Sequence, residues 1–295
     1  MNSETPWRAG RLGAARGTQR LLFGRMYEDV EIERRAFLNR RRVFCIASAG
    51  CTALALAQDH DVVACDINPV QLAYAEERAC GAGAIAGDVE RAMRLARFFA
   101  PSVGWRRQTV EDFLSLSEGD QQVEFWRKNL DTRRFRSALA VLLSPVTLRL
   151  VYAPHFLSVL PRHFPAVVRA RLERGFVRHP NASNPYIRAL FLGEPPPRLA
   201  THGPPVRFVL ADAASYLESC PAGSFDALTL SNILDGADAA YREKLSRAVR
   251  RAATPDAVVV LRSFAPPAAD AAANYAEHDR AMLWGTVDIR SALSF

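Results

Sequence analysis

The sequence lacks an apolar run long enough to cross a membrane, which takes about 20 residues in a helix. Its most apolar stretch, residues 139–153, is shorter and is interrupted by Ser144, Pro145 and Arg149. The opening residues, MNSETPWRAGRLGAARG, contain no apolar segment of the kind found in secretory signals. We therefore expect a cytoplasmic protein.

The sequence also lacks the motifs of several well-defined kinds of site. Its five cysteines form no CxxC pair, which is typical of reduced thiols in a cytosolic protein. No cluster of histidines, cysteines or carboxylates has the spacing of metal ligands, so we expect no metal. Neither a P-loop nor a nucleophile elbow is present, which argues against P-loop nucleotide hydrolysis and α/β-hydrolase chemistry.

Lysine is nearly absent, since Lys128 and Lys244 are the only two among the 38 lysine and arginine residues. The net charge of +7 therefore comes from arginines, and these are scattered rather than clustered. Scattered arginines are more typical of a compositional bias than of a nucleic-acid site, so we expect no nucleic-acid partner. The positive charge leaves a peripheral contact with an anionic membrane surface open.

Short apolar runs rich in β-branched residues alternate with helical patterns towards both ends of the chain. Strands are expected at residues 43–47, 61–65, 206–210, 225–230 and 257–261, and helices at 19–40, 52–58, 68–78 and 239–252. This alternation predicts βαβ units and a doubly wound α/β fold with a mainly parallel sheet. Residues 81–205 carry an arginine-rich, mostly helical pattern, which we expect to be an insertion between the core segments 41–80 and 206–295.

The first predicted strand ends in an unusual turn. In VFCIASAGCTALA (residues 43–55) the turn holds a single glycine, Gly50, whereas a dinucleotide-binding turn needs several to admit a pyrophosphate. Asp66 ends the second strand, where it can accept hydrogen bonds from ribose hydroxyls, and Asp212 follows the third, where it can accept from an adenine amino group. These features predict a site for a nucleoside without a phosphate, and S-adenosylmethionine is a common ligand of that description.

The candidate cofactor-binding residues follow the ends of four predicted strands and continue into the helix that starts at Asn68 and Pro69. An aspartate that closes a strand is often only a turn former or a helix cap, so each aspartate taken alone has that second interpretation. The candidates are Ala47, Ser48, Ala49, Gly50, Asp66, Ile67, Gln71, Asp212, Ala213, Ser231 and Asn232.

Six blocks of sequence, spread over most of the chain, carry further information. They are FGRMYEDVEIE (Phe23 to Glu33), IASAGCTALAL (Ile46 to Leu56), CDINPVQLAY (Cys65 to Tyr74), NPYIRALFLG (Asn184 to Gly193), SFDALTLSNILD (Ser224 to Asp235) and HDRAMLWG (His278 to Gly285). These blocks resemble those of the S-adenosylmethionine-dependent 3-amino-3-carboxypropyltransferases of betaine-lipid synthesis and their relatives. The third block, with the AGC turn before it, is the most specific of them.

The resemblance implies a class I methyltransferase-like (Rossmann-like) fold with S-adenosylmethionine as co-substrate. It also implies transfer of the 3-amino-3-carboxypropyl arm instead of the methyl group, with methylthioadenosine as by-product. A conventional methyltransferase holds the amino group of the arm with an acidic residue in the first strand, and here Cys45 stands at that position. We therefore expect residues 1–40, as a helical segment over the cofactor, and residues 81–205, as a helical cap, to hold the arm.

The predicted catalytic residues lie in the N-terminal block and in the insertion. They are Tyr27, Asn184 and Tyr186, which we expect to position the arm. Arg25, Arg188 and Arg280 are alternative partners for the carboxylate of the arm.

The identity of the acceptor has several alternatives. The leading hypothesis is transfer to a lipid hydroxyl, or to a hydroxyl or phenol of a small natural product. In the second, the amino group of the arm attacks its own γ-carbon and closes azetidine-2-carboxylate without another substrate. An ordinary methyltransferase, and a basic lipid- or RNA-binding module without activity, are further alternatives.

Overall fold

The computed structural model describes residues 19–151, 157, 159–194, 205–267 and 273–295. Its centre is a six-stranded sheet in the order β3-β2-β1-β4-β5-β6, in which the first five strands of the chain run parallel and β6 pairs antiparallel with β5. The α/β prediction with a mainly parallel sheet is confirmed, and the architecture is compatible with a Rossmann-like fold. The strands are β1 (Arg42–Ile46), β2 (Asp61–Asp66), β3 (Arg207–Leu210), β4 (Phe225–Thr229), β5 (Ala253–Ser263) and β6 (Thr286–Ser291).

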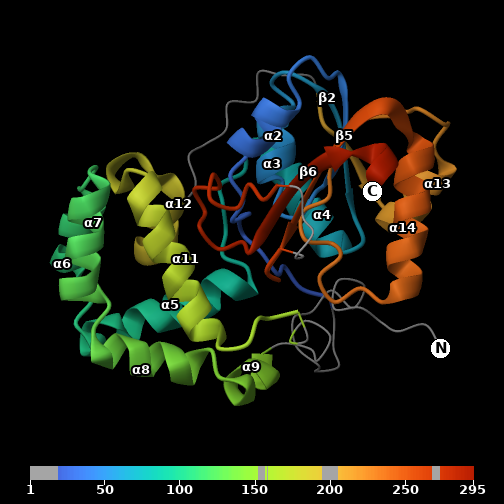
Figure 1. The fold of residues 1–295 in the computed structure, drawn as a ribbon. Helices are drawn as coiled ribbons and strands as arrows, with labels where there is room; N and C mark the ends of the chain where they lie inside the picture. The colour runs from blue at the N-terminus through green and yellow to red at the C-terminus, as the bar shows by residue number, and fades with distance from the viewer. Residues whose placement is uncertain (1–18, 152–156, 158, 195–204, 268–272) are drawn as a thin grey trace.

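Helices cover both faces of the sheet (Figure 1). Successive residues of a strand point to opposite faces. Phe44 of β1 packs in the cluster to which α13 (Ala213–Ser219) and α14 (Ala239–Ala252) contribute, whereas Val43 and Cys45 pack in the cluster of α2 (Glu31–Ala36) and α3 (Cys51–Leu56). Because central strands are buried on both faces, they are continuously apolar, which is why the sequence located them.

Three helices start on the same side of the sheet as the strand ends, each with a side-chain cap. Asn68 Oδ1 accepts hydrogen bonds from the backbone of α4 (Pro69–Ala79), which has a proline at its first position. Asp212 and Asp238 cap α13 and α14 in the same manner. These caps place polar side chains at the carboxyl edge of the sheet.

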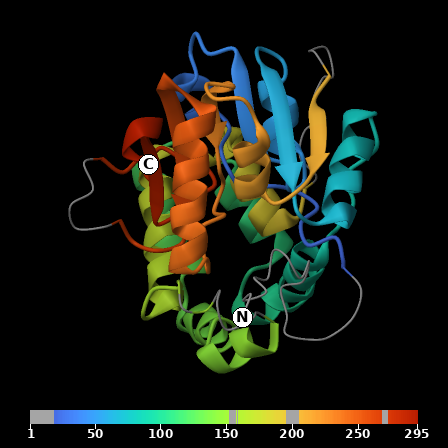
Figure 2. The ribbon, with the colours of Figure 1, turned by 90° about the vertical axis from the view of Figure 1, so that its right-hand side faces the viewer.

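The segment after α4 forms a helical lobe with its own aromatic core. Its helices are α5 (Asp88–Phe99), α6 (Arg107–Leu114), α7 (Gly119–Phe125), α8 (Arg133–Leu142), α9 (Pro145–Val151), α11 (Phe164–Arg178) and α12 (Pro185–Leu192). Phe113, Trp126, Phe176 and Phe191 are buried together at its centre. Figure 2 shows the carboxyl ends of β2 and β3 pointing towards this lobe.

One sequence prediction of local structure is wrong, and one strand was missed. Within residues 19–40 only Glu31–Ala36 forms a helix, because the backbone of residues 22–24 is hydrogen-bonded by side chains of α4 and α5 instead of by a helix of its own. The last strand, β6, was not predicted, since it lies at the edge of the sheet and alternates apolar residues with Asp288 and Arg290.

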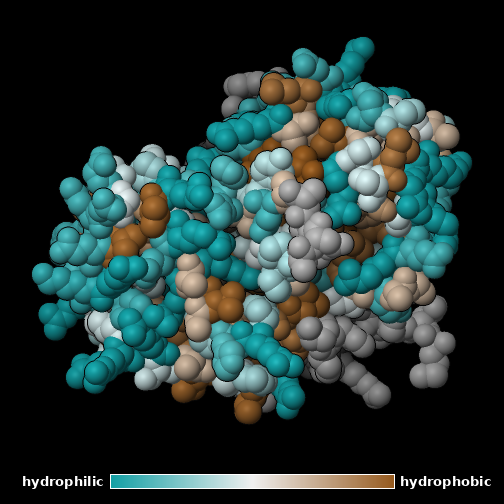
Figure 3. Space-filling model, viewed as in Figure 1, coloured by the Kyte–Doolittle hydropathy of each residue, from teal (hydrophilic) through white to brown (hydrophobic). Residues whose placement is uncertain are grey.

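The surface in the view of Figure 3 is mostly hydrophilic, with separate hydrophobic patches. Within the ranges given above, no helix has the length and apolar character needed to cross a membrane.

Candidate functional site

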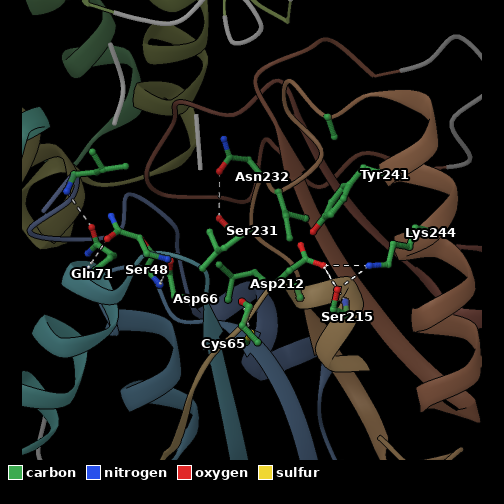
Figure 4. Close-up of a pocket in the computed structure, with 18 of the residues that line it drawn as sticks. Ser48, Cys65, Asp66, Gln71, Asp212, Ser215, Ser231, Asn232, Tyr241 and Lys244 are labelled. Carbon is green, nitrogen blue, oxygen red and sulfur yellow. Dashed lines mark hydrogen bonds and ion pairs between the residues drawn. The ribbon is translucent and has the colours of Figure 1, made fainter. Parts of the chain in front are cut away.

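A cleft of about 760 Å³ lies at the carboxyl ends of β1 to β4. It brings together side chains that follow four different strands, as the labels in Figure 4 show. Eight of the eleven candidate cofactor residues line this cleft, namely Ser48, Asp66, Ile67, Gln71, Asp212, Ala213, Ser231 and Asn232. The sequence therefore located this cleft through its strand ends.

In the cleft, the Asp66 carboxylate links the turn after β1 to the turn after β2. Its carboxylate accepts hydrogen bonds from the backbone N of Ser48 at 2.9 Å and of Asn68 at 2.8 Å. Burial nevertheless raises the pKa of Asp66 to about 6, although these N–H groups favour the charged form. A carboxylate has about four acceptor positions, so Asp66 retains capacity for the hydroxyl groups of a ligand.

Asp212 lies on the other side of the cleft and caps α13. Its Oδ1 atom accepts hydrogen bonds from Ser215 N and Ser215 Oγ, both at 2.9 Å, and lies 3.7 Å from Lys244 Nζ. The Tyr241 hydroxyl also bonds to this carboxylate, and burial, together with the charge of Asp212, raises the pKa of Tyr241. Tyr241 and Lys244 were missed by the sequence analysis, because they come from the first two turns of α14 and follow no strand.

The small residues of the first turn, Ser48 excepted, pack against the rest of the fold and do not line the cleft. Ala47, Ala49 and Gly50 do not line the cleft. Gly50 has φ +78°, and a Cβ atom there would lie 3.2 Å from Ala75 Cβ of α4. The turn is therefore small because it packs against α4, and Ser48 is the part of it that faces the cleft.

Gln71 lines the cleft and also holds the N-terminal segment. Its Oε1 atom accepts from Leu22 N at 3.1 Å and from Phe23 N at 3.2 Å, and its Nε2 atom donates to Phe23 O at 2.8 Å. These bonds engage both the oxygen and the nitrogen of the side-chain amide. Gln71 thus fixes the N-terminal segment along the cleft, and Leu22 and Phe23 become part of the cleft wall.

A second cavity of about 900 Å³ adjoins the cleft and lies between the sheet and the helical lobe. Phe23, Ser48, Ser231 and Asn232 line both spaces. Most of the other described lining residues are apolar or aromatic and come from α5, α8, α11, α12 and the loop before β6. A ligand seated in the cleft can therefore extend into this second cavity.

Three polar side chains that line the second cavity come from the N-terminal segment. Arg25 is 8% exposed, and its Nη1 atom has no hydrogen-bond partner among the described residues. Tyr27 donates to Met93 Sδ at 3.4 Å, and burial raises the pKa of Tyr27 to about 12. Glu28 Oε1 accepts a hydrogen bond from the Ser231 hydroxyl, and burial raises the pKa of Glu28 to about 7.

A fully buried guanidinium lies behind Glu28. Arg262 donates to Glu33, with Nη2 3.0 Å from Glu33 Oε2, and to Asp279 Oδ2 from Nε at 3.1 Å. Its Nη1 atom lies 3.7 Å from Glu28 Oε2. This network joins α2, β5 and the loop before β6. Its members are far apart in the chain, so no local pattern of the sequence indicates it.

Asn184 lines neither the cleft nor the second cavity. Its Oδ1 atom accepts from Tyr186 N at 3.0 Å and caps α12, while its Nδ2 atom donates to Arg280 O at 2.9 Å. The side chain is 1% exposed. The structure therefore places Asn184 as a helix cap that ties α12 to the loop before β6, and the predicted catalytic role is not supported.

Tyr186 and two of the candidate arginines are likewise committed to other contacts. The Tyr186 hydroxyl donates to Asp29 Oδ1 and accepts from Val30 N, both at 3.4 Å, and the residue lines neither space. Arg280 binds Asp29 with two hydrogen bonds of 2.5 and 2.6 Å, and Arg188 binds Glu194 with two of 2.7 and 2.6 Å. Of the three candidate arginines, Arg25 alone lines one of these two spaces.

No protein-family model, no curated protein and no solved structure matches this chain. In the part of the chain that the structure describes, no group of three or more histidines, cysteines and carboxylates could hold a metal ion. The interpretation of the site therefore rests on its own geometry.

Proposed function

We propose that the protein transfers the 3-amino-3-carboxypropyl group of S-adenosylmethionine to a hydroxyl acceptor and releases methylthioadenosine. The observation that carries the proposal is the pair of adjoining spaces, because each suits one part of this ligand. In the cleft at the strand ends, Asp66 and Asp212 suit a nucleoside, and the second cavity has a buried guanidinium for the carboxylate of the arm.

The cleft suits an adenosine without phosphates. Asp66 is placed to accept from the ribose hydroxyls, and Asp212 from the adenine amino group. Ile46, Ile233 and Tyr241 supply apolar wall for the base. The cleft itself has a single cation among its described lining residues, Lys244, which lies near Asp212 and is placed poorly for a pyrophosphate.

Arg25 supports the assignment of the arm to the second cavity. A buried guanidinium without a full set of acceptors is costly, and an entering carboxylate would supply them in bidentate geometry. The sulfonium would then lie near Ser48 and Ser231, where the two spaces meet. The γ-carbon would face the second cavity, so attack there would break the bond to sulfur and leave neutral methylthioadenosine in the cleft.

The size of the second cavity favours a separate acceptor over cyclisation. Cyclisation needs room for the arm alone, and a small closed pocket would suit it best. The observed space of about 900 Å³ lies in the range of cavities that hold a whole small molecule. An apolar molecule bearing a hydroxyl group is therefore the acceptor class that we favour.

Incubation with S-adenosylmethionine, with and without hydroxyl-bearing acceptors, tests the proposal through the nucleoside product. We expect methylthioadenosine above the level of a protein-free control, with the rate raised by an acceptor. Azetidine-2-carboxylate formed without an acceptor would indicate cyclisation instead. S-adenosylhomocysteine as the main product would identify a methyltransferase, and failure to bind the ligand would favour a binding module without this activity.

A further inference from the structure

Glu28 is the one acidic side chain among the described residues that line the second cavity. It is 6% exposed, and its Oε1 atom accepts the hydrogen bond from Ser231. Its Oε2 atom accepts no hydrogen bond from the described residues and lies 3.7 Å from Arg262 Nη1. A carboxylate has about four acceptor positions, so Glu28, which lines this cavity, has capacity for a donor that enters it.

The surroundings of Glu28 leave its protonated and ionised forms similarly populated near neutral pH. Arg262 of β5 faces it but also pairs with Glu33 of α2 and Asp279 of the loop before β6. Cys45 of β1 lies within electrostatic range. Burial raises the pKa of Glu28 to about 7, and the charge of Arg262 limits that rise. Such a carboxyl can take up a proton near neutral pH.

The walls of the second cavity favour a flat apolar ligand. Trp105, Phe135, Phe191 and Trp284 contribute aromatic rings to the wall, and such surfaces bind other rings well. A phenol has a pKa of about 10, as in tyrosine, which is about three units above that of Glu28. An aliphatic hydroxyl is a far weaker acid, closer to water with a pKa of about 16, so this carboxylate suits a phenol better.

We propose that the second cavity binds a neutral aromatic molecule with a phenolic hydroxyl and that Glu28 accepts the proton of that hydroxyl. The role of this molecule as the acceptor of the transferred group rests on the proposed function. In that reaction an oxygen lone pair forms a bond to the γ-carbon, and the carbon–sulfur pair stays on sulfur. The phenolic proton moves to the Glu28 carboxylate and then to solvent, so the products are an aryl ether, methylthioadenosine and one proton.

Calorimetric titration with 2-naphthol tests the site without any reaction. A phenol donates a stronger hydrogen bond to a carboxylate than to a neutral carboxyl, so we expect about tenfold tighter binding at pH 8 than at pH 5.5. Glu28→Gln should bind 2-naphthol with no such pH dependence. Its fold should survive, because Arg262 keeps Glu33 and Asp279 as partners, and thermal unfolding checks this.

Two controls distinguish binding that depends on the hydrogen bond to Glu28 from binding by apolar contact alone. 2-Methoxynaphthalene lacks the donor and should bind without pH dependence. Ser231→Gly removes the hydroxyl that favours the charged form of Glu28 while suiting the φ of +50° at this position. It should therefore move the midpoint of the 2-naphthol pH dependence to higher pH.

The results separate this inference from the proposed function. Binding of 2-naphthol that does not depend on pH, an unchanged pH dependence in Glu28→Gln, or binding of 1-decanol in place of 2-naphthol would overturn the inference. If wild-type protein forms methylthioadenosine but Glu28→Gln keeps its full rate and pH profile, the inference also fails while the function stands. Binding that depends on Glu28 without methylthioadenosine formation would overturn only the function.

Discussion

At the scale of single residues, Arg25 is the side chain whose surroundings point most clearly to a ligand. It is buried beside apolar residues, and its Cζ atom lies 5.9 Å from the centre of the Tyr27 ring. A cation–π contact offsets only part of the cost of burying a guanidinium, typically about 0.5–2 kcal/mol. The remaining cost is the reason to expect an anion at this point when the site is filled.

Arg25→Gln should weaken the binding of S-adenosylmethionine about tenfold or more, because a hydrogen bond to a charged partner is worth ~1.5–3 kcal/mol. The same variant should raise the free energy of unfolding of the ligand-free protein, since it removes a buried charge that lacks a full set of partners. Calorimetry and urea denaturation measure the two effects. Arg94→Gln, on the exposed side of α5, is the matched control and should change neither. An unchanged affinity in Arg25→Gln would remove Arg25 from the site.

At the scale of elements, side chains of other elements hold the N-terminal segment in the site, and the sequence candidate Gln71 is one of them. Gln71 of α4 fixes residues 22–23, and Trp284 Nε1 donates to Tyr27 O at 2.9 Å, so both hold the N-terminal segment in place. Glu90 of α5 accepts from Gly24 N at 2.7 Å. The segment can therefore be extended and still be well ordered, because other elements supply its hydrogen bonds.

Asn184→Ala should lower the free energy of unfolding by about 1–3 kcal/mol, because α12 loses its cap and the carbonyl of Arg280 loses a buried donor. The affinity for S-adenosylmethionine should stay within about twofold, since Asn184 lines neither space. Urea denaturation and calorimetry check the two expectations. Asn184→Asp, which keeps the capping oxygen, should cost less stability. A large loss of affinity at unchanged stability would restore the catalytic interpretation.

At the scale of the whole molecule, the site concentrates buried carboxyl groups. Burial raises the pKa of Glu28 to about 7 and the pKa values of Asp66 and Asp279 to about 6 each. Against the effect of burial, the hydrogen bonds of Arg280 hold the pKa of Asp29 below its ordinary value. The first three groups bind protons more tightly in the folded than in the unfolded chain, and Asp29 binds its proton less tightly.

The sign of the resulting pH dependence follows from proton uptake. Between about pH 5 and pH 7.5 the unfolded carboxyls are ionised, while the three raised groups of the folded protein still lose protons, so stability falls as pH rises. We expect the free energy of unfolding from urea denaturation to be higher at pH 5 than at pH 7.5 by roughly 2 kcal/mol or more. Asp66→Asn should make the difference smaller. A free energy of unfolding that rises over this range would contradict the assignment of these groups.

The sequence by itself determined the features that depend on neighbours in the chain. Apolar periodicity located the five parallel strands and α14, and the strand ends identified Ser48, Asp66, Asp212, Ser231 and Asn232 as residues of one cleft. The reason is physical, since parallel strands bring their carboxyl ends to one edge of the sheet whatever their order.

Only the tertiary structure decided which polar residues face a cavity and which stabilise the fold. Both Asn184 and Arg25 were candidates from the sequence, yet one caps a helix and the other lines the second cavity with a buried Nη1 atom that has no hydrogen-bond partner among the described residues. Arg262 meets Glu33 from 229 positions away, and the second cavity exists because the helical lobe packs near the sheet edge. Such contacts depend on how distant segments pack together, which the pattern of any one segment does not encode.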